Sequence, residues 1–238
     1  KLSLDKDSMV TELASNDGYL LRNFLNMQIP CLGIEPTKST AQESEKLGIE
    51  TIQEFFGEKL ATKLLSDGYS SDLIIGNNVY AHVPDINDFT KGIQILLKKN
   101  GVVTLEFPHL LKLMQGSQFD TIYHEHFSYF SLHTVKKIFE AFDLKVFDVE
   151  ILSTHGGSLR VYGCHMASNQ KTSITVIDLL KAETAYGLTS LATYLGFQSE
   201  IEIVKNKFLE TLIKIKNENK TIVGYGAAAK GNPLLNYA

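Results

Sequence analysis

The sequence contains no tryptophan, only two cysteines among its 238 residues, and no long uninterrupted apolar run. Two cysteines, Cys31 and Cys164, exclude a disulfide framework and a cysteine-rich zinc site, and they fit a reducing compartment, so we expect a cytoplasmic protein. A membrane span needs roughly 18 apolar residues, so we expect no membrane partner. The opening residues also lack the apolar core of a signal peptide.

An excess of positive charge is missing as well. Scattered through the chain are 23 basic residues against 27 acidic ones, which gives a net charge of −4. Binding to nucleic acid needs a basic face that neutralises phosphates, so we do not expect that partner. With 44% hydrophobic and 21% charged residues, the composition is that of a globular protein with a substantial core.

Strand-like and helix-like patterns alternate along the first two thirds of the chain. We predict strands at 9–15, 31–36, 50–56, 72–78 and 101–108, and helices at 17–27, 37–47, 57–66 and 84–99. An irregular segment rich in aromatic residues and histidine follows at 109–130, then a helix at 132–142 and a strand hairpin at 144–152 and 158–166. Repeated strand–helix steps require a parallel sheet, into which the hairpin inserts one antiparallel strand. This arrangement resembles the Rossmann-like fold of class I S-adenosylmethionine (SAM) methyltransferases.

The pattern changes after residue 166, so we predict a SAM-binding domain over 1–166 and a partial C-terminal domain over 167–238. A polar linker leads to helices at 174–187 and 199–219. A strand, a glycine-rich turn and a helix then follow from residue 221, and they indicate the start of a second α/β domain. The alternative is that this last strand joins the edge of the first sheet.

The first strand ends in a turn of small and polar residues that lets a ligand approach the backbone. The glycine pattern of dinucleotide-binding turns is absent. Glu12, at the strand end, disfavours a pyrophosphate and suits a ligand with a cationic amino-acid end, such as SAM. Glu35 closes the second strand, where a carboxylate accepts hydrogen bonds from ribose hydroxyls. The other candidate cofactor contacts of the turn are Ala14, Ser15, Asn16 and Gly18. The alternative is a purely structural turn with a surface glutamate.

Asn77 and Asn78 end the fourth strand, and His82 follows closely. Ligands of open α/β sheets lie at the carboxyl ends of the strands, so we expect the two asparagines to contact the cofactor and His82 to face the active site. A structural role for His82 is the alternative.

The densest group of reactive side chains is Tyr123, His124, Glu125 and His126, after the fifth strand. Histidine is a natural base near neutral pH, glutamate can orient it, and tyrosine can donate to a developing oxyanion. A metal site is less well supported, because the usual spacing of zinc ligands is absent, and we expect no metal. An aromatic lid with incidental histidines is the other alternative.

Six segments together resemble the sugar C-methyltransferases: ELASNDGYLL, GIEPT, NNVYAHVPD, YHEHFSYFSLHTV, HGGSLRVY and GYGAAAKGN. The resemblance covers nearly the whole chain, but it does not include the family's cysteine-rich zinc-binding N-terminal region, and it includes only part of the C-terminal domain. It implies that SAM is the cofactor and that C3 of a nucleotide-linked 4-keto-deoxy sugar receives the methyl group through an enolate.

The resemblance also implies roles for individual residues. His126 matches the family's catalytic base, Tyr123 and Glu125 match its companions, and His82 matches a further active-site histidine. Lys230, with Tyr225, lies in the second glycine-rich loop and is expected to meet the nucleotide diphosphate. Two other classes remain open, namely a SAM-dependent enzyme acting on oxygen or nitrogen of a small molecule, and a non-catalytic binding fragment.

Overall fold

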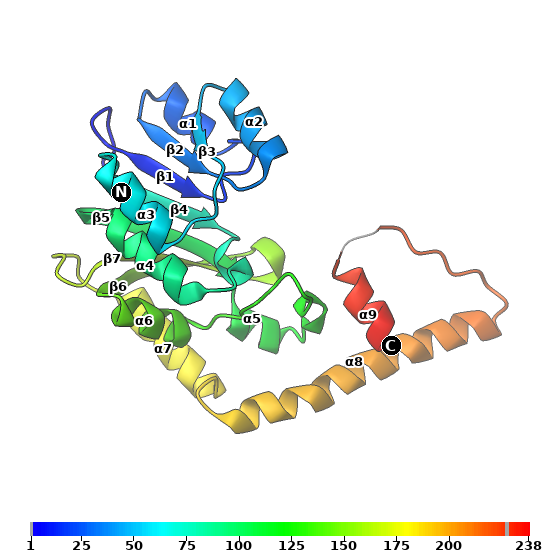
Figure 1. The fold of residues 1–238 in the computed structure, drawn as a ribbon. Helices are drawn as coiled ribbons and strands as arrows, with labels where there is room; N and C mark the ends of the chain where they lie inside the picture. The colour runs from blue at the N-terminus through cyan, green and yellow to red at the C-terminus, as the bar shows by residue number, and fades with distance from the viewer. Residues whose placement is uncertain (1, 227–228) are drawn as a thin grey trace.

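A computed structural model describes residues 2–226 and 229–238. Its centre is a seven-stranded sheet in the order β3-β2-β1-β4-β5-β7-β6 (Figure 1). Within the described residues, only β7 runs against the direction of the other strands. The strands are β1 (Val10–Leu13), β2 (Cys31–Ile34), β3 (Glu50–Ile52), β4 (Ser71–Asn77), β5 (Leu97–Pro108), β6 (Leu144–Leu152) and β7 (Ser158–His165). The predicted parallel sheet with one inserted antiparallel strand is confirmed.

Helices cover both faces of this sheet, because its central strands are apolar on both sides. On β4, Ile74 packs with the core formed by α3, α4, α6 and α7, whereas Leu73 and Ile75 pack on the opposite face with α1. The helices are α1 (Leu21–Asn26), α2 (Lys38–Lys46), α3 (Glu58–Ser66), α4 (Ile86–Leu96), α5 (Leu110–Gln115), α6 (Leu132–Ala141), α7 (Ile174–Tyr186), α8 (Leu191–Asn217) and α9 (Gly231–Tyr237). No helix in the described ranges is both long and apolar enough to span a bilayer.

Several turns of the chain lie at one edge of the sheet because of the directions in which its strands run. The parallel strands β1, β2, β4 and β5 all end there, and the antiparallel β7 begins there. The turn between β6 and β7, with the short 3-10 turn Thr154–Gly156, therefore lies at the same edge as the segment that follows β5. This edge contains most of the candidate site residues.

The structure differs from the prediction on both sides of β5: the strand begins earlier than predicted, and a helix follows it. The prediction ended a helix at Asn100-Gly101, but α4 ends at Leu96 and β5 already begins at Leu97. The reason is an irregularity in the pairing with β4, where Ser71 pairs with Leu97 while Leu73 pairs with Val102, so that the intervening residues bulge from the ladder. The segment predicted as irregular also contains α5, whose Leu111, Leu113 and Met114 are buried.

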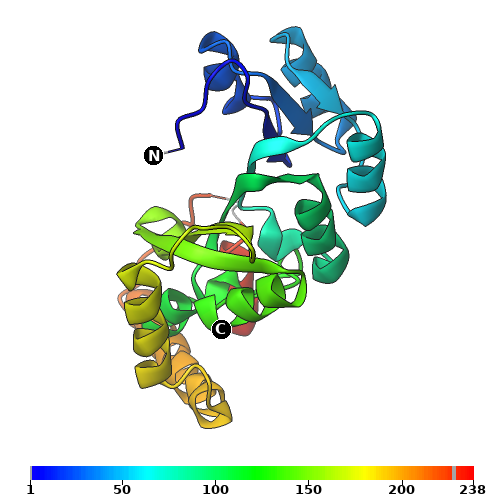
Figure 2. The same cartoon turned by 90° about the vertical axis from the view of Figure 1, so that its left-hand side faces the viewer.

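The last part of the chain departs further from prediction. Helix α8 begins at Leu191 rather than 199 and extends away from the sheet, and α9 returns alongside it (Figure 1, Figure 2). The strand predicted from residue 221 is wrong, because 221–226 has no strand pairing and exposes Val223 and Tyr225. Neither a second sheet nor an added edge strand is therefore present in the described residues. Residues 227–228 of the predicted glycine-rich turn lie outside them.

Candidate functional site

The turn after β1 has an unusual backbone conformation. Ala14, Asn16 and Gly18 all have positive φ angles, of 57°, 54° and 77°. At Gly18 an added Cβ would lie 2.6 Å from the Ser44 hydroxyl and 2.7 Å from a methyl of Ile49, so glycine is required there for space as well as for φ. The resulting turn is tight, and it leaves Ala14 and Asn16 exposed at the carboxyl edge.

Glu12 is the buried acid at the end of β1. Its side chain is 5% exposed, and among the described residues its Oε2 atom has no hydrogen-bond partner. Burial, and secondarily the charge of Asp17, raise the pKa of Glu12 to about 8. A buried carboxyl with a free acceptor atom is suited to a cationic ligand group, which would favour its charged form.

Glu35 joins the turns after β1 and β2. Its carboxylate, 7% exposed, accepts the backbone N–H of Asn16 at 3.1 Å and that of Thr37 at 2.8 Å. Each carboxylate oxygen can accept a further hydrogen bond. Glu35 therefore fixes the two turns to each other and still has acceptor capacity for a ligand.

An apolar cavity of about 510 Å³ opens beside these turns, within the size range of small-molecule sites. Of the candidate residues, Ala14 and His82 line it, whereas Ser15 is packed over Gly33 with its hydroxyl buried. Phe55 and Phe56 also line the cavity but were not predicted as site residues, because the prediction placed them in the strand 50–56; β3 in fact ends at Ile52, and Phe55 is 85% exposed. The remaining lining residues are Ile34, Pro36, Glu54, Val79, Val83, Pro84, Asp85, Asp88 and Phe89.

The two asparagines lie next to this cavity at the end of β4. Asn77 pairs in register with Glu106 of β5. Asn78 has φ 54° and donates its N–H to the Glu106 carbonyl at 2.8 Å. This bond directs the chain into the 3-10 turn Tyr80–His82, which brings His82 to the cavity wall.

His126 is held in one tautomer by its backbone. Its Nδ1 atom lies 2.9 Å from the Thr121 carbonyl oxygen, which can only accept, so Nδ1 carries the proton and Nε2 has a free lone pair in the neutral ring. Burial lowers the pKa of His126, helped by His82 and Lys230, and these effects outweigh the opposing ones of the Thr121 carbonyl and Glu125. The lowered pKa favours the neutral imidazole form of His126, in which Nε2 can accept a proton.

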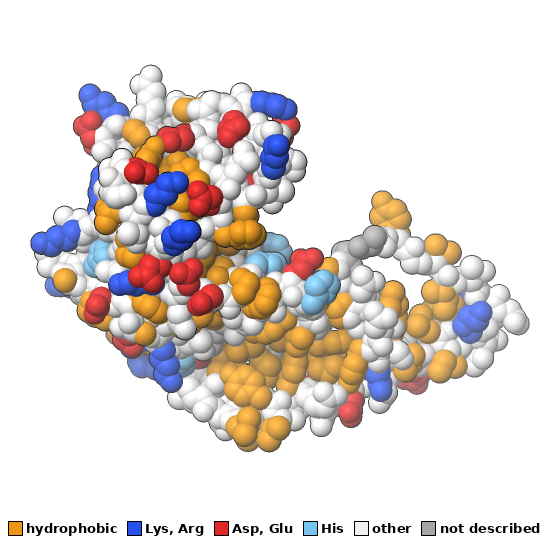
Figure 3. All heavy atoms as spheres, viewed as in Figure 1, with side chains coloured by type: hydrophobic (Ala, Val, Ile, Leu, Met, Phe, Trp, Pro, Cys, Tyr) orange, Lys and Arg blue, Asp and Glu red, His pale blue; other side chains and the backbone are white. Residues whose placement is uncertain are grey.

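The neighbours of His126 are the other predicted catalytic residues. Its ring centroid lies 4.8 Å from that of His82 and 4.5 Å from that of Tyr123. Burial, and the nearby charge of Glu125, raise the pKa of Tyr123, so its hydroxyl stays protonated and can donate. The segment is fixed to the turn after β4 because Phe127 N–H donates to the Ala81 carbonyl at 2.9 Å. Figure 3 shows histidine side chains beside hydrophobic ones on this face of the molecule.

The two residues of the second glycine-rich loop differ in position. Lys230 is half-buried and lies close enough to His126 for its charge to lower the pKa of that histidine. Tyr225 is fully exposed, and no contact places it at the cavity. Helix α9 is held against the segment before His126, since the rings of Phe119 and Tyr237 lie 5.4 Å apart.

A half-buried cluster of charged residues under the turn between β6 and β7 was not foreseen from the sequence. Arg160 of β7 contacts Glu106 at 2.8 Å and Glu150 at 3.3 Å, and Thr154 donates to Glu106 at 3.2 Å. The antiparallel register places these three strands side by side. The arrangement fixes the turn 153–157 at the carboxyl edge, where Gln118 also donates to the Gly156 carbonyl at 2.9 Å.

Across the described ranges, no group of three or more His, Cys, Asp or Glu side chains is arranged to hold a metal ion. Cys31 and Cys164 are free thiols, on β2 and β7. The absence of a metal stays a prediction.

Comparison with known proteins agrees with this geometry. A family model described as a methyltransferase domain matches residues 1–149, and one described as a C-methyltransferase C-terminal domain matches residues 153–238. The chain is 33% identical over 235 residues to the C-methyltransferase NovU of Streptomyces niveus, which covers 99% of this chain. It spans 56% of that relative's length.

Solved structures show the same fold at low sequence identity. A SAM-dependent methyltransferase from Anabaena variabilis has a TM-score of 0.53 at 15% identity, covering 69% of this chain and 79% of its own. Magnesium protoporphyrin IX methyltransferase from Synechocystis, with bound S-adenosylhomocysteine, has a TM-score of 0.52 at 12% identity, covering 66% and 74%. With more than half of its length matched by the methyltransferase-domain model, the chain belongs to the SAM-dependent methyltransferases.

Proposed function

We propose that this chain methylates a carbon atom next to a ketone, and that the acceptor is C3 of a nucleotide-linked 4-keto-deoxy sugar. The observation that carries the proposal is a neutral histidine, His126, whose ring lies against that of His82. His82 in turn lines the apolar cavity. Methylation of carbon needs a base that removes a proton, and Nε2 of His126 is available for that task.

The cofactor site of the proposal is the cavity with the turns around it. SAM supplies a methyl group on a positively charged sulfur when it is bound. The orphaned carboxyl oxygen of Glu12 suits its ammonium group, the acceptors of Glu35 suit the ribose hydroxyls, and the apolar wall with Ala14 and Phe56 suits the adenine. Asn16, Gly18, Asn77 and Asn78 complete the proposed site through the turns on which they lie.

The remaining candidate residues act on the nucleotide sugar in this proposal. His126 takes the C3 proton at Nε2, and Glu125 favours the resulting imidazolium by its charge. Tyr123 keeps its hydroxyl proton and donates to the oxygen of the developing enolate. His82 borders the reacting carbon. Lys230, with its charge near His126, meets the diphosphate of the nucleotide, and Tyr225 is the weaker candidate because of its exposure.

Support for carbon as the acceptor atom comes from one relative of the chain and from one family model. The name of the Streptomyces niveus relative and the description of the C-terminal family model both specify C-methyltransferases. An enzyme acting on oxygen or nitrogen would have no need of a donor for an enolate oxygen.

The experiment is a product assay by mass spectrometry. The chain is incubated with SAM and either a nucleotide 4-keto-deoxy sugar or the matching 4-hydroxy sugar. The proposal expects a gain of one methyl group, on carbon, with the ketone alone. Methylation of the hydroxy sugar at oxygen would instead identify an O-methyltransferase, and would contradict the proposal.

A further inference from the structure

We propose that Glu183 of α7 is a positioning residue that holds together both ends of segment 110–131, and so sets the place of Tyr123 and His126. The catalytic meaning of that segment rests on the function proposed above. The positioning itself is a property of the fold, and it connects the C-terminal region of the chain to the segment that contains the base.

The evidence is one carboxylate with three hydrogen-bond donors. His109, just before the segment, approaches Glu183 Oε1 with its Nε2 at 2.7 Å. Just after the segment, Leu132 N–H donates to Oε1 at 2.6 Å and His133 N–H donates to Oε2 at 3.0 Å. The side chains of His109 and Glu183 are both fully buried. A single side chain thus bonds to both ends of a segment of more than twenty residues.

The partners of Glu183 are suited to a charged carboxylate. Leu132 and His133 form the first turn of α6, where free N–H groups and the helix dipole favour a negative charge. Burial by itself raises the pKa of Glu183, but the hydrogen bonds from His109, His133 and Leu132 outweigh it and lower the pKa overall. The charge is therefore retained in the interior because these donors surround it.

The segment has few other attachments of this kind. Its ends meet through the hydrogen bond from Leu110 N–H to the Phe130 carbonyl at 2.9 Å. Between them, Gln118 donates to the Gly156 carbonyl, and Phe127 and Ser128 donate to the Ala81 carbonyl. The residues around His126 are exposed or half-buried. Loss of the Glu183 bonds therefore acts on the ends of a segment that the core supports only partly.

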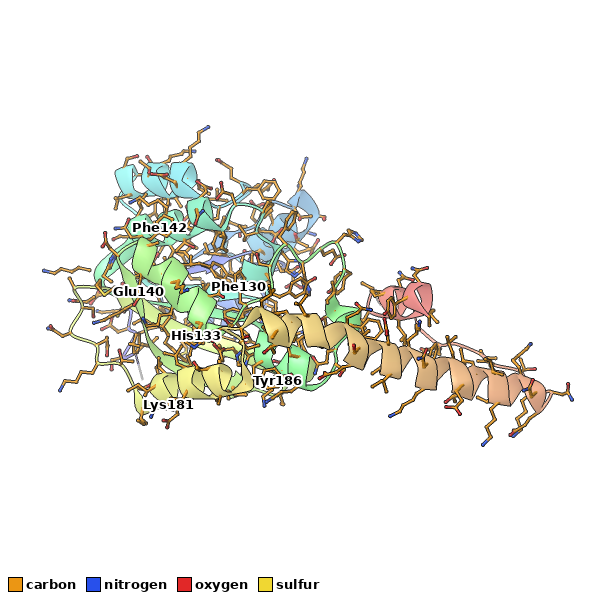
Figure 4. All side chains as sticks on the ribbon, turned by 90° about the horizontal axis from the view of Figure 1, so that it is seen from below. Phe130, His133, Glu140, Phe142, Lys181 and Tyr186 are labelled. Carbon is orange, nitrogen blue, oxygen red and sulfur yellow. The ribbon has the colours of Figure 1, made fainter. Side chains whose placement is uncertain are left out.

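Helices α6 and α7 lie side by side at this point. His133 is located between them and reaches the Leu180 carbonyl at 3.2 Å and the Thr184 hydroxyl at 3.0 Å (Figure 4). Glu183 thus comes from the part of the chain that matches the C-methyltransferase C-terminal model, whereas the base comes from the part before it. In this proposal the C-terminal region contributes to the site by fixing the position of the base.

The test compares Glu183→Gln with a matched control on the same helix, Asp178→Asn, whose carboxylate is exposed. Glutamine offers one acceptor oxygen and turns an N–H₂ group toward donors. We expect amide hydrogen exchange at Leu110, His126 and Phe127 to become about ten- to a hundredfold faster, as for the loss of a charged hydrogen bond. In Glu183→Gln we expect unchanged exchange in β1 and β4 and an unchanged affinity for S-adenosylhomocysteine. In Asp178→Asn we expect exchange in the segment at the rate of the unmutated chain.

A second readout separates positioning from general stabilisation. The pKa of His126, followed by NMR, should rise toward its ordinary value of about 6.5 in Glu183→Gln, because a loosened segment exposes the ring. A chain that only melts at a lower temperature, with unchanged His126 pKa and unchanged exchange in the segment, would overturn the proposal.

If Glu183→Gln does not fold, His109→Phe decides the question. Phenylalanine keeps the aromatic ring but removes one of the three donors, so faster exchange is expected at Leu110. Unchanged exchange there would overturn the proposal. None of these readouts uses a ketone substrate, so a failure of the proposed function appears in the product assay and a failure of the positioning role appears here.

Discussion

We expect the charge state of Glu12 to depend on whether a cationic ligand group is bound beside it. Its pKa of about 8 in the free chain means that it is protonated at pH 6. A ligand ammonium favours the carboxylate, so binding releases the proton and the affinity for S-adenosylhomocysteine should rise between pH 6 and pH 8, by up to about tenfold per pH unit. Isothermal titration at several pH values measures this slope. Glu12→Gln should remove the slope, and a slope that persists in that variant would count against the assignment.

Glu35 is predicted to contribute to cofactor affinity through a charged hydrogen bond. Glu35→Ala should weaken S-adenosylhomocysteine binding about ten- to a hundredfold, because such a bond contributes roughly 1.5–3 kcal/mol. Part of the loss comes from the turn, which the carboxylate fixes through Asn16 and Thr37. The control is Glu43→Ala, an exposed glutamate on α2. Equal affinity in both variants argues against a role for Glu35.

At this scale the sequence identified residues whose position follows from strand direction. Glu12, Glu35 and His82 lie in or after strands that end at one edge, so their common location at that edge could be predicted. The proximity of residues that only tertiary packing brings together could not be predicted. Arg160 meets Glu106 only through the antiparallel register of β7, and Glu183 meets His109 only because α7 packs beside α6.

Among the connecting elements, the turn between β6 and β7 requires glycine at position 157. Gly157 has φ +125°, and an added Cβ would lie 2.7 Å from the Lys112 side chain. Gly157→Ala should therefore lower the free energy of unfolding by about 1–3 kcal/mol, measured by urea denaturation. Gly196→Ala is the matched control, since no atom lies within 4 Å of its added Cβ, and in helix α8 it should be neutral or stabilising by up to about 1 kcal/mol. Equal losses in the two variants would contradict this explanation.

The predicted elements agree best with the structure at β4 and at the hairpin of β6 and β7. The apolar run of β4 and the hairpin of β6 and β7 were recognised with nearly correct ends. The prediction failed between α4 and β5, where a bulge in the ladder made a turn signal part of a strand. It also failed at 221–226, because β-forming residues become a strand only if a partner strand is present.

For the whole molecule, the sheet and the gathering of the candidate site residues at one of its edges followed from the order of strands and helices. The return of α9 to the segment before His126 could not be predicted, since it depends on contacts such as that of Phe119 with Tyr237.

The chain spans about half the length of the curated relative that it matches. The division at residue 166 into two domains remains a proposal, and α7 packs on the sheet as part of its core.

Metal content is a prediction for the whole chain. With two free cysteines on separate strands and no cluster of ligands among the described residues, we expect well below one zinc ion per chain after dialysis. Elemental analysis by mass spectrometry measures it directly. A stoichiometric zinc ion that is lost in His124→Ala or His126→Ala would instead assign these histidines to a metal site.

The central claim, that His126 removes a proton next to a ketone, is tested most directly by deuterium exchange at C3 of a nucleotide 4-keto-deoxy sugar. The assay runs in D₂O with S-adenosylhomocysteine, which has no methyl group to transfer, so only proton removal is observed. We predict exchange by the unmutated chain and by His124→Ala, an exposed neighbour, and a rate about a hundred- to ten-thousandfold lower in His126→Ala. Exchange by His126→Ala at the unmutated rate would contradict the claim and make His82 the next candidate for the base.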